Sequence, residues 1–203
     1  MFVFLASFII FIAWLTYELK KHEKLEKNSL NDFWAKEREA NRTRKKSLDD
    51  LAYVKIPFDC IPKSLLPGDD TVQDCLSVLQ GLSDKKIVNF TGFSNTDLKL
   101  QYGAANLTVL SEYDENYTLY ARTIYRLALA YYQNGYESNA RILLEKAVES
   151  GTDISGNYKL LADIYQTHGE TDKIRGLLTR ASSLRSAAGK KIIRSLEEYV
   201  REH

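Results

Sequence analysis

The side chains best suited to metal binding or nucleophilic catalysis are few and scattered in this sequence. Histidine occurs at His22, His168 and His203, and cysteine at Cys60 and Cys75. Such sites require fixed spacings, yet the sequence contains no HExxH, nucleophile elbow or phosphate-binding glycine loop. Two cysteines 15 residues apart form neither a CxxC pair nor a disulfide framework. We therefore expect no metal site, and free thiols in a reducing compartment.

Two pairs of adjacent acidic residues, Asp49-Asp50 and Asp69-Asp70, offer the other candidate catalytic groups. Each pair precedes a stretch in which we expect a helix to begin. An aspartate in that position accepts a backbone N–H and caps the helix. Capping explains the pairs without acid–base catalysis. The prediction is a protein that is not an enzyme and needs no cofactor.

The composition of the 203-residue chain is that of a globular protein, with 44% hydrophobic and 27% charged residues. These values argue against general disorder and against a membrane protein of many spans. The formal net charge is +1, from 28 Lys or Arg against 27 Asp or Glu. The surface as a whole is therefore not built to hold nucleic acid, which makes such a partner an unlikely one.

The apolar residues are concentrated near the amino terminus, where residues 2–19 read FVFLASFIIFIAWLTYEL with Glu18 as the single charge. A membrane helix requires about 20 apolar residues. We therefore predict that residues 1–19 form an uncleaved transmembrane anchor. A cleaved signal peptide is the alternative, but the basic start and the small-residue cleavage site that it requires are both absent.

Basic residues follow this apolar run and none precedes it. Because lysine and arginine resist translocation, we predict a single pass through the plasma membrane, with the amino terminus outside and the bulk of the chain cytoplasmic. The basic residues that we assign to the membrane-proximal surface are Lys20, Lys21, Lys24, Lys27, Arg42, Arg44, Lys45 and Lys46.

Residues 20–46 contain no glycine or proline and are rich in Glu, Lys, Ala and Arg, so a helical stalk is expected. Its weakest point is Asn28–Asn31. The run Arg42–Lys46 has the charge to contact anionic lipid or nucleic acid. Phe33 and Trp34 stand among charged residues. They either pack back onto the folded domain, which we favour, or form a contact between copies of the chain.

The three prolines of the chain, Pro57, Pro62 and Pro67, lie within eleven residues. Proline lacks a backbone donor and moves its predecessor out of the helical conformation. We therefore expect residues 47–68 to be an extended strap. Its apolar residues suit a position on the surface of the domain.

The second half of the chain repeats at a fixed interval of 34 residues. Corresponding pairs are Ile124 and Tyr158, Leu127 and Leu161, Ala128 and Ala162, Tyr131 and Tyr165, and Gly135 and Gly169. The small alanines allow helices to approach closely, and the tyrosines fill the space beside them. The glycines permit the positive φ at which helices end. The pattern predicts helices at about residues 119–134, 136–150, 155–168 and 171–185.

The two LAxxY sequences, at residues 127–131 and 161–165, resemble the tetratricopeptide repeat. The resemblance implies an all-α fold, in which helical hairpins stack into a short α-solenoid over residues 121–203. The chain departs from the family pattern at Thr152 and Ser186, which replace proline, and at Ile174, which replaces a small residue. The order of anchor, stalk, strap and helical pairs also resembles uncharacterised membrane-tethered proteins of Gram-positive anaerobes.

Two repeats require caps, because each buries its apolar face only against its neighbours. Residues 69–120 are expected to form an irregular helical cap, with one helix after an N-cap at Asp70 and another near residues 107–114. At the carboxyl end we expect an amphipathic capping helix. Its apolar side carries Ile192, Ile193, Leu196, Tyr199 and Val200.

The resemblance also implies a groove for a protein or peptide partner, lined by the first helix of each repeat. The residues on that face are Arg122, Tyr125, Arg126, Leu129, Tyr132, Lys159, Asp163 and Gln166. Guanidinium groups in such a groove would suit an acidic or aromatic segment. The alternative is a solvated or self-filled groove, covered by the strap.

These features lead to three hypotheses. The first is a membrane-tethered scaffold that binds its partner in the groove. The second is a structural membrane protein that associates with itself through the stalk and Phe33-Trp34. The third is a sensor of anionic lipid or nucleic acid that acts through Arg42–Lys46.

Overall fold

The computed structural model describes residues 2–62 and 64–201. Met1, Lys63, Glu202 and His203 lie outside this part, as do the side chains of residues 2–6, 9, 10, 13 and 23–29, which include Lys24 and Lys27 of the predicted basic cluster. The described chain is all-helical, and its one β feature is an isolated antiparallel bridge between Tyr53 and Val88. Two units can be distinguished: the chain up to Lys46 together with Asn95–Asn106, and Ser47–Ser94 together with the chain from Leu107 onward.

The first unit is built on a long helix, α1 (Phe2–Arg42), which continues through the stalk without a break at Asn28–Asn31. A short helix, α3 (Asn95–Tyr102), packs near its carboxyl end, where Ala40 is fully buried. Glu37 of α1 forms an ion pair with Lys99 and accepts a hydrogen bond from Thr96 at 2.7 Å. These two partners hold the pKa of Glu37 below its usual value.

The basic run leaves the helix, contrary to the prediction of a helical stalk to residue 46. The backbone N–H of Lys46 donates to the carbonyl of Tyr102 at 3.0 Å, and the Asn106 amide donates to the carbonyl of Lys46 at 2.9 Å. Gly103 has φ +94° and lies so close to the backbone of Arg44 that no Cβ would fit there. Tertiary hydrogen bonds therefore end the helix at Arg42, and the side chains of Arg44 and Lys46 stay exposed.

Among the residues that the structure describes, we find no helix that is both long enough and apolar enough to cross a membrane.

The aromatic pair on α1 is not buried, although burial against the folded domain was the favoured interpretation. Phe33 and Trp34 are 51% and 55% exposed. Their rings meet edge to face, with centroids 5.3 Å apart. The pair therefore keeps an accessible apolar surface on an otherwise polar stretch of helix.

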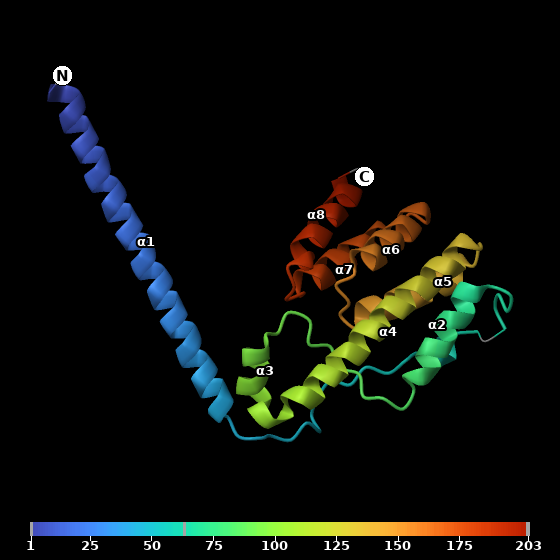
Figure 1. Ribbon diagram of the computed structural model, residues 1–203. Helices are drawn as coiled ribbons and strands as arrows, with labels where there is room; N and C mark the ends of the chain where they lie inside the picture. The colour runs from blue at the N-terminus through green and yellow to red at the C-terminus, as the bar shows by residue number, and fades with distance from the viewer. Residues whose placement is uncertain (1, 63, 202–203) are drawn as a thin grey trace. The chain divides into compact units, whose positions relative to one another are not determined.

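The second unit consists mainly of six helices, α2 (Asp70–Gly81), α4 (Leu107–Gln133), α5 (Glu137–Glu149), α6 (Ser155–Thr167), α7 (Thr171–Ser182) and α8 (Ala188–Arg201). From α4 onward, each helix packs against the next, and α6 also contacts α8 (Figure 1). α2 packs on α4. The core contains the alanines and tyrosines of the repeat together with Leu127, Leu144, Leu161, Ile174 and Leu196.

The four predicted repeat helices are confirmed within three residues at their boundaries, except at the start of α4. The prediction of a separate helix near residues 107–114 is wrong, because this segment continues into the first repeat helix as one element of 27 residues. Residues 107–133 contain no glycine or proline, the residues that usually end a helix. The N-cap of α2 is Asp69, whose carboxylate accepts the Val72 N–H at 3.0 Å, and not Asp70. Asp49 and Asp50 lie in a turn that does not open a helix.

The repeat period is retained in the turns. Gly135 and Gly169 have φ of +83° and +69°, and the following N–H bonds back to Tyr131 at 2.9 Å or to Tyr165 at 2.8 Å. This is the Schellman arrangement that closes a helix at a left-handed residue. Both tyrosines are buried, but their hydroxyl groups have different surroundings. The hydroxyl of Tyr165 donates to Glu145 at 2.8 Å, whereas the hydroxyl of Tyr131 has no hydrogen-bond partner in the described chain.

The turn between α5 and α6 is held by side chains from several segments. The Asn89 amide donates to the carbonyls of Ser150 and Gly151 at 3.0 and 2.9 Å. Tyr117 of α4 donates to Ser150 at 3.1 Å, and Tyr158 of α6 donates to the carbonyl of Thr152 at 3.0 Å. Burial raises the pKa of Tyr158 to about 12. We name this group of hydrogen bonds the turn clasp.

The described residues of the proline-containing segment pack against the helical unit. Ile61 is buried in the core, and Val54, Ile56 and Phe58 pack against it. The N–H of Val54 donates to the carbonyl of Ile87 at 2.9 Å. The short 3-10 helix η1 (Phe58–Cys60) contacts α5. The strap therefore lies on the α5 side of the helical unit.

The turn clasp predicts a specific loss of stability in Asn89→Ala. This change leaves two carbonyls without their donor in a partly buried position, so we expect the free energy of unfolding to fall by about 1–3 kcal/mol. Urea denaturation would measure the change. The control is Asn134→Ala, because Asn134 also donates to a helix carbonyl, at 2.9 Å, but is exposed, so the expected change is under about 0.5 kcal/mol. Equal losses in the two variants would contradict the clasp.

Candidate functional site

The structure leaves the basic residues of the predicted groove exposed. Arg122 of α4 and Lys159 of α6 are exposed and make no ion pair with any described residue. Arg126 is 51% exposed and pairs with Asp74 of α2 at 3.0 Å. Two repeat lengths after Arg122 and Arg126 lie Lys190 and Arg194 of α8, which are also exposed. α4 and α8 therefore present cations at corresponding positions, whereas α6 has Gly156 and Leu160 there.

The aromatic and apolar residues assigned to the groove have a different role. Tyr125, Leu129 and Tyr132 are partly buried and pack against the core. The Tyr125 ring lies directly on Gly156 of α6, where a Cβ would clash with its hydroxyl. These three residues join α4 to its neighbours, so we do not place them among the groups free to contact a partner.

The acidic residue of the groove is already engaged. Asp163 accepts a hydrogen bond from Tyr199 of α8 at 2.6 Å, and Tyr199 lies 34 residues after Tyr165. Gln166 is partly buried. This hydrogen bond comes from a neutral hydroxyl, so the exposed carboxylate of Asp163 keeps its negative charge. The face therefore carries both signs of charge, with cations in excess among the predicted residues.

The strap does not occupy this face in the way that the self-filled alternative proposed. Residues 52–57 and Asp59 line a hollow of about 640 Å³ against Tyr120, Lys146 and Glu149. These neighbours belong to the other side of α4 and to α5. The strap thus covers the second-helix side of the first hairpin.

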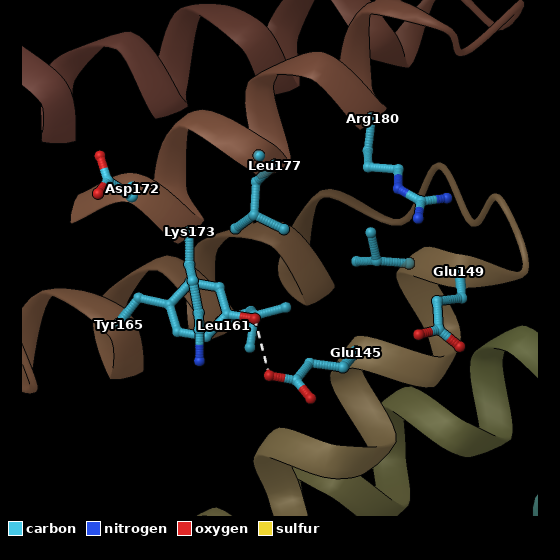
Figure 2. A pocket seen from close by; sticks show the side chains of 10 residues that line it. Glu145, Glu149, Leu161, Tyr165, Asp172, Lys173, Leu177 and Arg180 are labelled. Atoms are coloured by element: carbon cyan, nitrogen blue, oxygen red, sulfur yellow. Dashed lines mark hydrogen bonds between the residues drawn. The ribbon is translucent and has the colours of Figure 1, made fainter. Parts of the chain in front are cut away.

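A second pocket, of about 400 Å³, lies between α5, α6 and α7 (Figure 2). We name it the α5–α7 pocket. Its apolar floor is formed by Val148, Leu161 and Leu177, and its walls by charged residues of α5 and α7. The charged and polar lining residues are Glu145, Glu149, Tyr165, Asp172, Lys173 and Arg180.

A network of charges holds one end of the α5–α7 pocket. Glu145 accepts hydrogen bonds from Tyr165 at 2.8 Å and from Arg141 at 3.0 Å. Arg141 and Lys173 both pair with Glu170, at 2.9 and 3.0 Å, and both cations lie over the Tyr165 ring. Lys173 and Arg141 hold the pKa of Glu170 below its usual value, while burial raises the pKa of Tyr165.

The middle of the α7 wall is open because Gly176 carries no side chain. A Cβ built on Gly176 would meet no atom within 4 Å. One turn further on, Arg180 is exposed and forms no ion pair with the described residues. In Figure 2 its guanidinium lies on the same side of the pocket as Glu149. Sequence reasoning missed this site, since it lies on second helices; a glycine inside a helix was the signal that could have indicated it.

In the described residues, no three His, Cys, Asp or Glu side chains gather as a metal site would require. Cys60 and Cys75 are free thiols, as expected, and burial raises the pKa of both. A raised thiol pKa lowers the fraction of reactive thiolate. Neither cysteine lines the α5–α7 pocket.

Comparisons with known proteins yield no relative: no family model matches the chain, and no curated protein or solved structure matches it.

The openness of the pocket at Gly176 can be tested by a pair of alanine substitutions. Gly176→Ala should raise the free energy of unfolding by roughly 0.5–1 kcal/mol, because alanine favours the helix and its methyl group meets nothing. Gly135→Ala, at an equally open position but with φ +83°, should lower it by about 1–2 kcal/mol. Thermal and urea unfolding would measure both. A destabilised Gly176→Ala variant would show that the pocket is filled.

Proposed function

We propose that this protein is a membrane-tethered scaffold that binds a protein or peptide partner on the exposed first-helix face of its helical repeats. The observation that carries the proposal is a pair of exposed cations on neighbouring first helices, Arg122 on α4 and Lys159 on α6, which form no ion pair with any residue that the structure describes. A surface of this kind attracts an acidic segment, because guanidinium and ammonium groups form charge-assisted hydrogen bonds with carboxylates. The resemblance of the repeats to tetratricopeptide repeats supports the same face.

The tether in this proposal is the apolar run at residues 2–19, which the basic cluster beginning at Lys20 follows. With the basic residues retained inside, the repeats would be cytoplasmic and the amino terminus outside. A protein anchored in this way would remain with the membrane fraction after alkaline carbonate washing. Its release by that treatment would exclude an integral anchor and leave the binding face to be tested separately.

The binding face is tested by charge reversal in the full-length protein. A biotin ligase fused to the carboxyl terminus would label neighbouring proteins in the native host, and mass spectrometry would quantify them. In Arg122→Glu combined with Lys159→Glu, we expect labelling of the partner to fall roughly tenfold, since the charges that attract it are reversed. The control is Lys85→Glu, which reverses an exposed cation outside this face. Identical labelling in all three proteins would contradict the proposed binding face.

A second candidate function, self-association through the stalk, is favoured by the exposure of Phe33 and Trp34. An exposed aromatic pair on a charged helix is a plausible contact between copies, because its burial removes apolar surface from water. Phe33→Ser combined with Trp34→Ser should convert an oligomer to a monomer in sedimentation experiments in detergent. Leu119→Ser serves as the control, since Leu119 is also exposed, at 45%, but lies on α4. A wild-type protein that is already monomeric would exclude this function.

A further inference from the structure

We propose that the α5–α7 pocket is a second binding surface, which takes an amphipathic peptide segment of a protein partner. The segment would place one apolar side chain over Gly176 and a carboxylate against Arg180. Three features support this assignment: the space beside Gly176, an exposed cation at Arg180 that forms no ion pair with any described residue, and an apolar floor between charged residues of α5 and α7.

The space is suited to a large side chain. The pocket of about 400 Å³ falls within the usual range for binding sites, roughly 300–1,000 Å³. Gly176 lies inside α7 with nothing within 4 Å of the position where a Cβ would be. Because glycine weakens a helix interior relative to alanine, a glycine that contacts nothing brings no packing benefit to the isolated chain. What it does provide is an opening above Leu177 and Leu161.

The chemistry of the walls selects the partner. Arg180 lies one turn beyond Gly176, and its exposed guanidinium can receive a carboxylate through two parallel hydrogen bonds. Across the pocket, α5 contributes Glu145 and Glu149, which are already paired with Arg141 at 3.0 Å and with Lys146 at 2.9 Å. Among the described lining residues, Arg180 is thus the charged group without an ion pair. A segment with an acidic residue toward Arg180 would match this charge, and a basic residue there would place like charges together.

The shape favours a peptide over a small molecule. Lys173 and Arg180 are seven residues apart on α7, which corresponds to about 10 Å along the helix. The charged positions therefore extend along a trough open to solvent and do not converge on one point. An elongated segment of a protein can reach both ends of such a trough, with its apolar residue between them.

The pocket is also held in shape without a ligand. Tyr165, Glu145 and Arg141 are joined by hydrogen bonds of 2.8 and 3.0 Å, and Glu170 connects Arg141 to Lys173. This network fixes side chains of α5, α6 and α7 at one end of the trough. A site that is already ordered loses less conformational entropy when a partner binds.

This surface is independent of the proposed groove. Its residues belong to the second helices α5 and α7 and to the buried side of α6, whereas Arg122 and Lys159 lie on first helices. Binding at the two surfaces can therefore be separated by substitution.

Panning would test the proposal directly. A displayed library of short random peptides would be selected on the full-length protein in lipid nanodiscs, and the affinities of selected peptides measured by fluorescence polarisation. We expect peptides with a bulky apolar residue one helical turn from an Asp or Glu. Gly176→Leu, which fills the opening, and Arg180→Glu, which reverses the charge, should each weaken binding roughly tenfold or more.

Matched controls accompany these variants. Gly81→Leu adds the same side chain at an open helical position outside the pocket, and Lys85→Glu reverses an exposed cation elsewhere. Both should bind as the wild type does. Because Arg180 is exposed, Arg180→Glu keeps the test valid if Gly176→Leu does not fold.

Two outcomes would overturn the inference. In the first outcome, the selected peptides bind Gly176→Leu and Arg180→Glu with unchanged affinity but no longer bind the double variant Arg122→Glu, Lys159→Glu. This result would locate recognition in the groove alone and leave the proposed function standing. A selection in which no peptide depends on the pocket would also exclude it. Peptides that depend on the pocket, and not on Arg122 or Lys159, would support the second surface whatever the fate of the groove.

Discussion

The backbone carbonyls at the end of α5 impose the constraint on which the second unit depends. A helix ends with carbonyls that have no partner of their own, and in this protein those of Ser150 and Gly151 are partly enclosed by other segments. Their donors are Asn89, from the loop that precedes α3, and Tyr117 of α4, while Tyr158 of α6 serves the carbonyl of Thr152. The turn clasp therefore connects the first hairpin, the second hairpin and the segment at residues 87–89.

Two glycines show how the same hairpins produce one closed surface and one open surface. At Gly156 the missing side chain admits the ring of Tyr125, so a side chain of α4 reaches the backbone of α6 on the first-helix side. At Gly176 no atom of the described chain lies within 4 Å of the position of a Cβ, and this glycine lines the pocket on the second-helix side. The first-helix side is left with exposed cations, and the second-helix side with an apolar floor between charged walls.

The first unit has its own physical basis. The carboxylate of Glu37 is surrounded by Lys99 and Thr96, and Ala40 allows α3 to lie close to α1. Hydrogen bonds from Lys46 and Asn106 then hold the basic segment to the end of α3, and its side chains remain in solvent. Segments far apart in the chain thus define this unit, which no local pattern indicates.

The 34-residue spacing was sufficient to predict the helices of both repeats and the glycines that end them, because helix formation and left-handed turns depend on residues close in the sequence. The strap was predictable for the same reason, since its prolines exclude a helix locally. Three other features could not be predicted, because each depends on which surfaces meet in the folded chain. They are the continuity of α4, the pairing of α3 with α1 and the exposure of Phe33 and Trp34. The cations assigned to the candidate groove are exposed. The sequence did not indicate the contacts of Tyr125 with Gly156 and of Asp163 with Tyr199, because these partners lie 31 and 36 residues away. The α5–α7 pocket exists only in the tertiary structure, because the space above Gly176 is bounded by three helices whose separation no single helix determines.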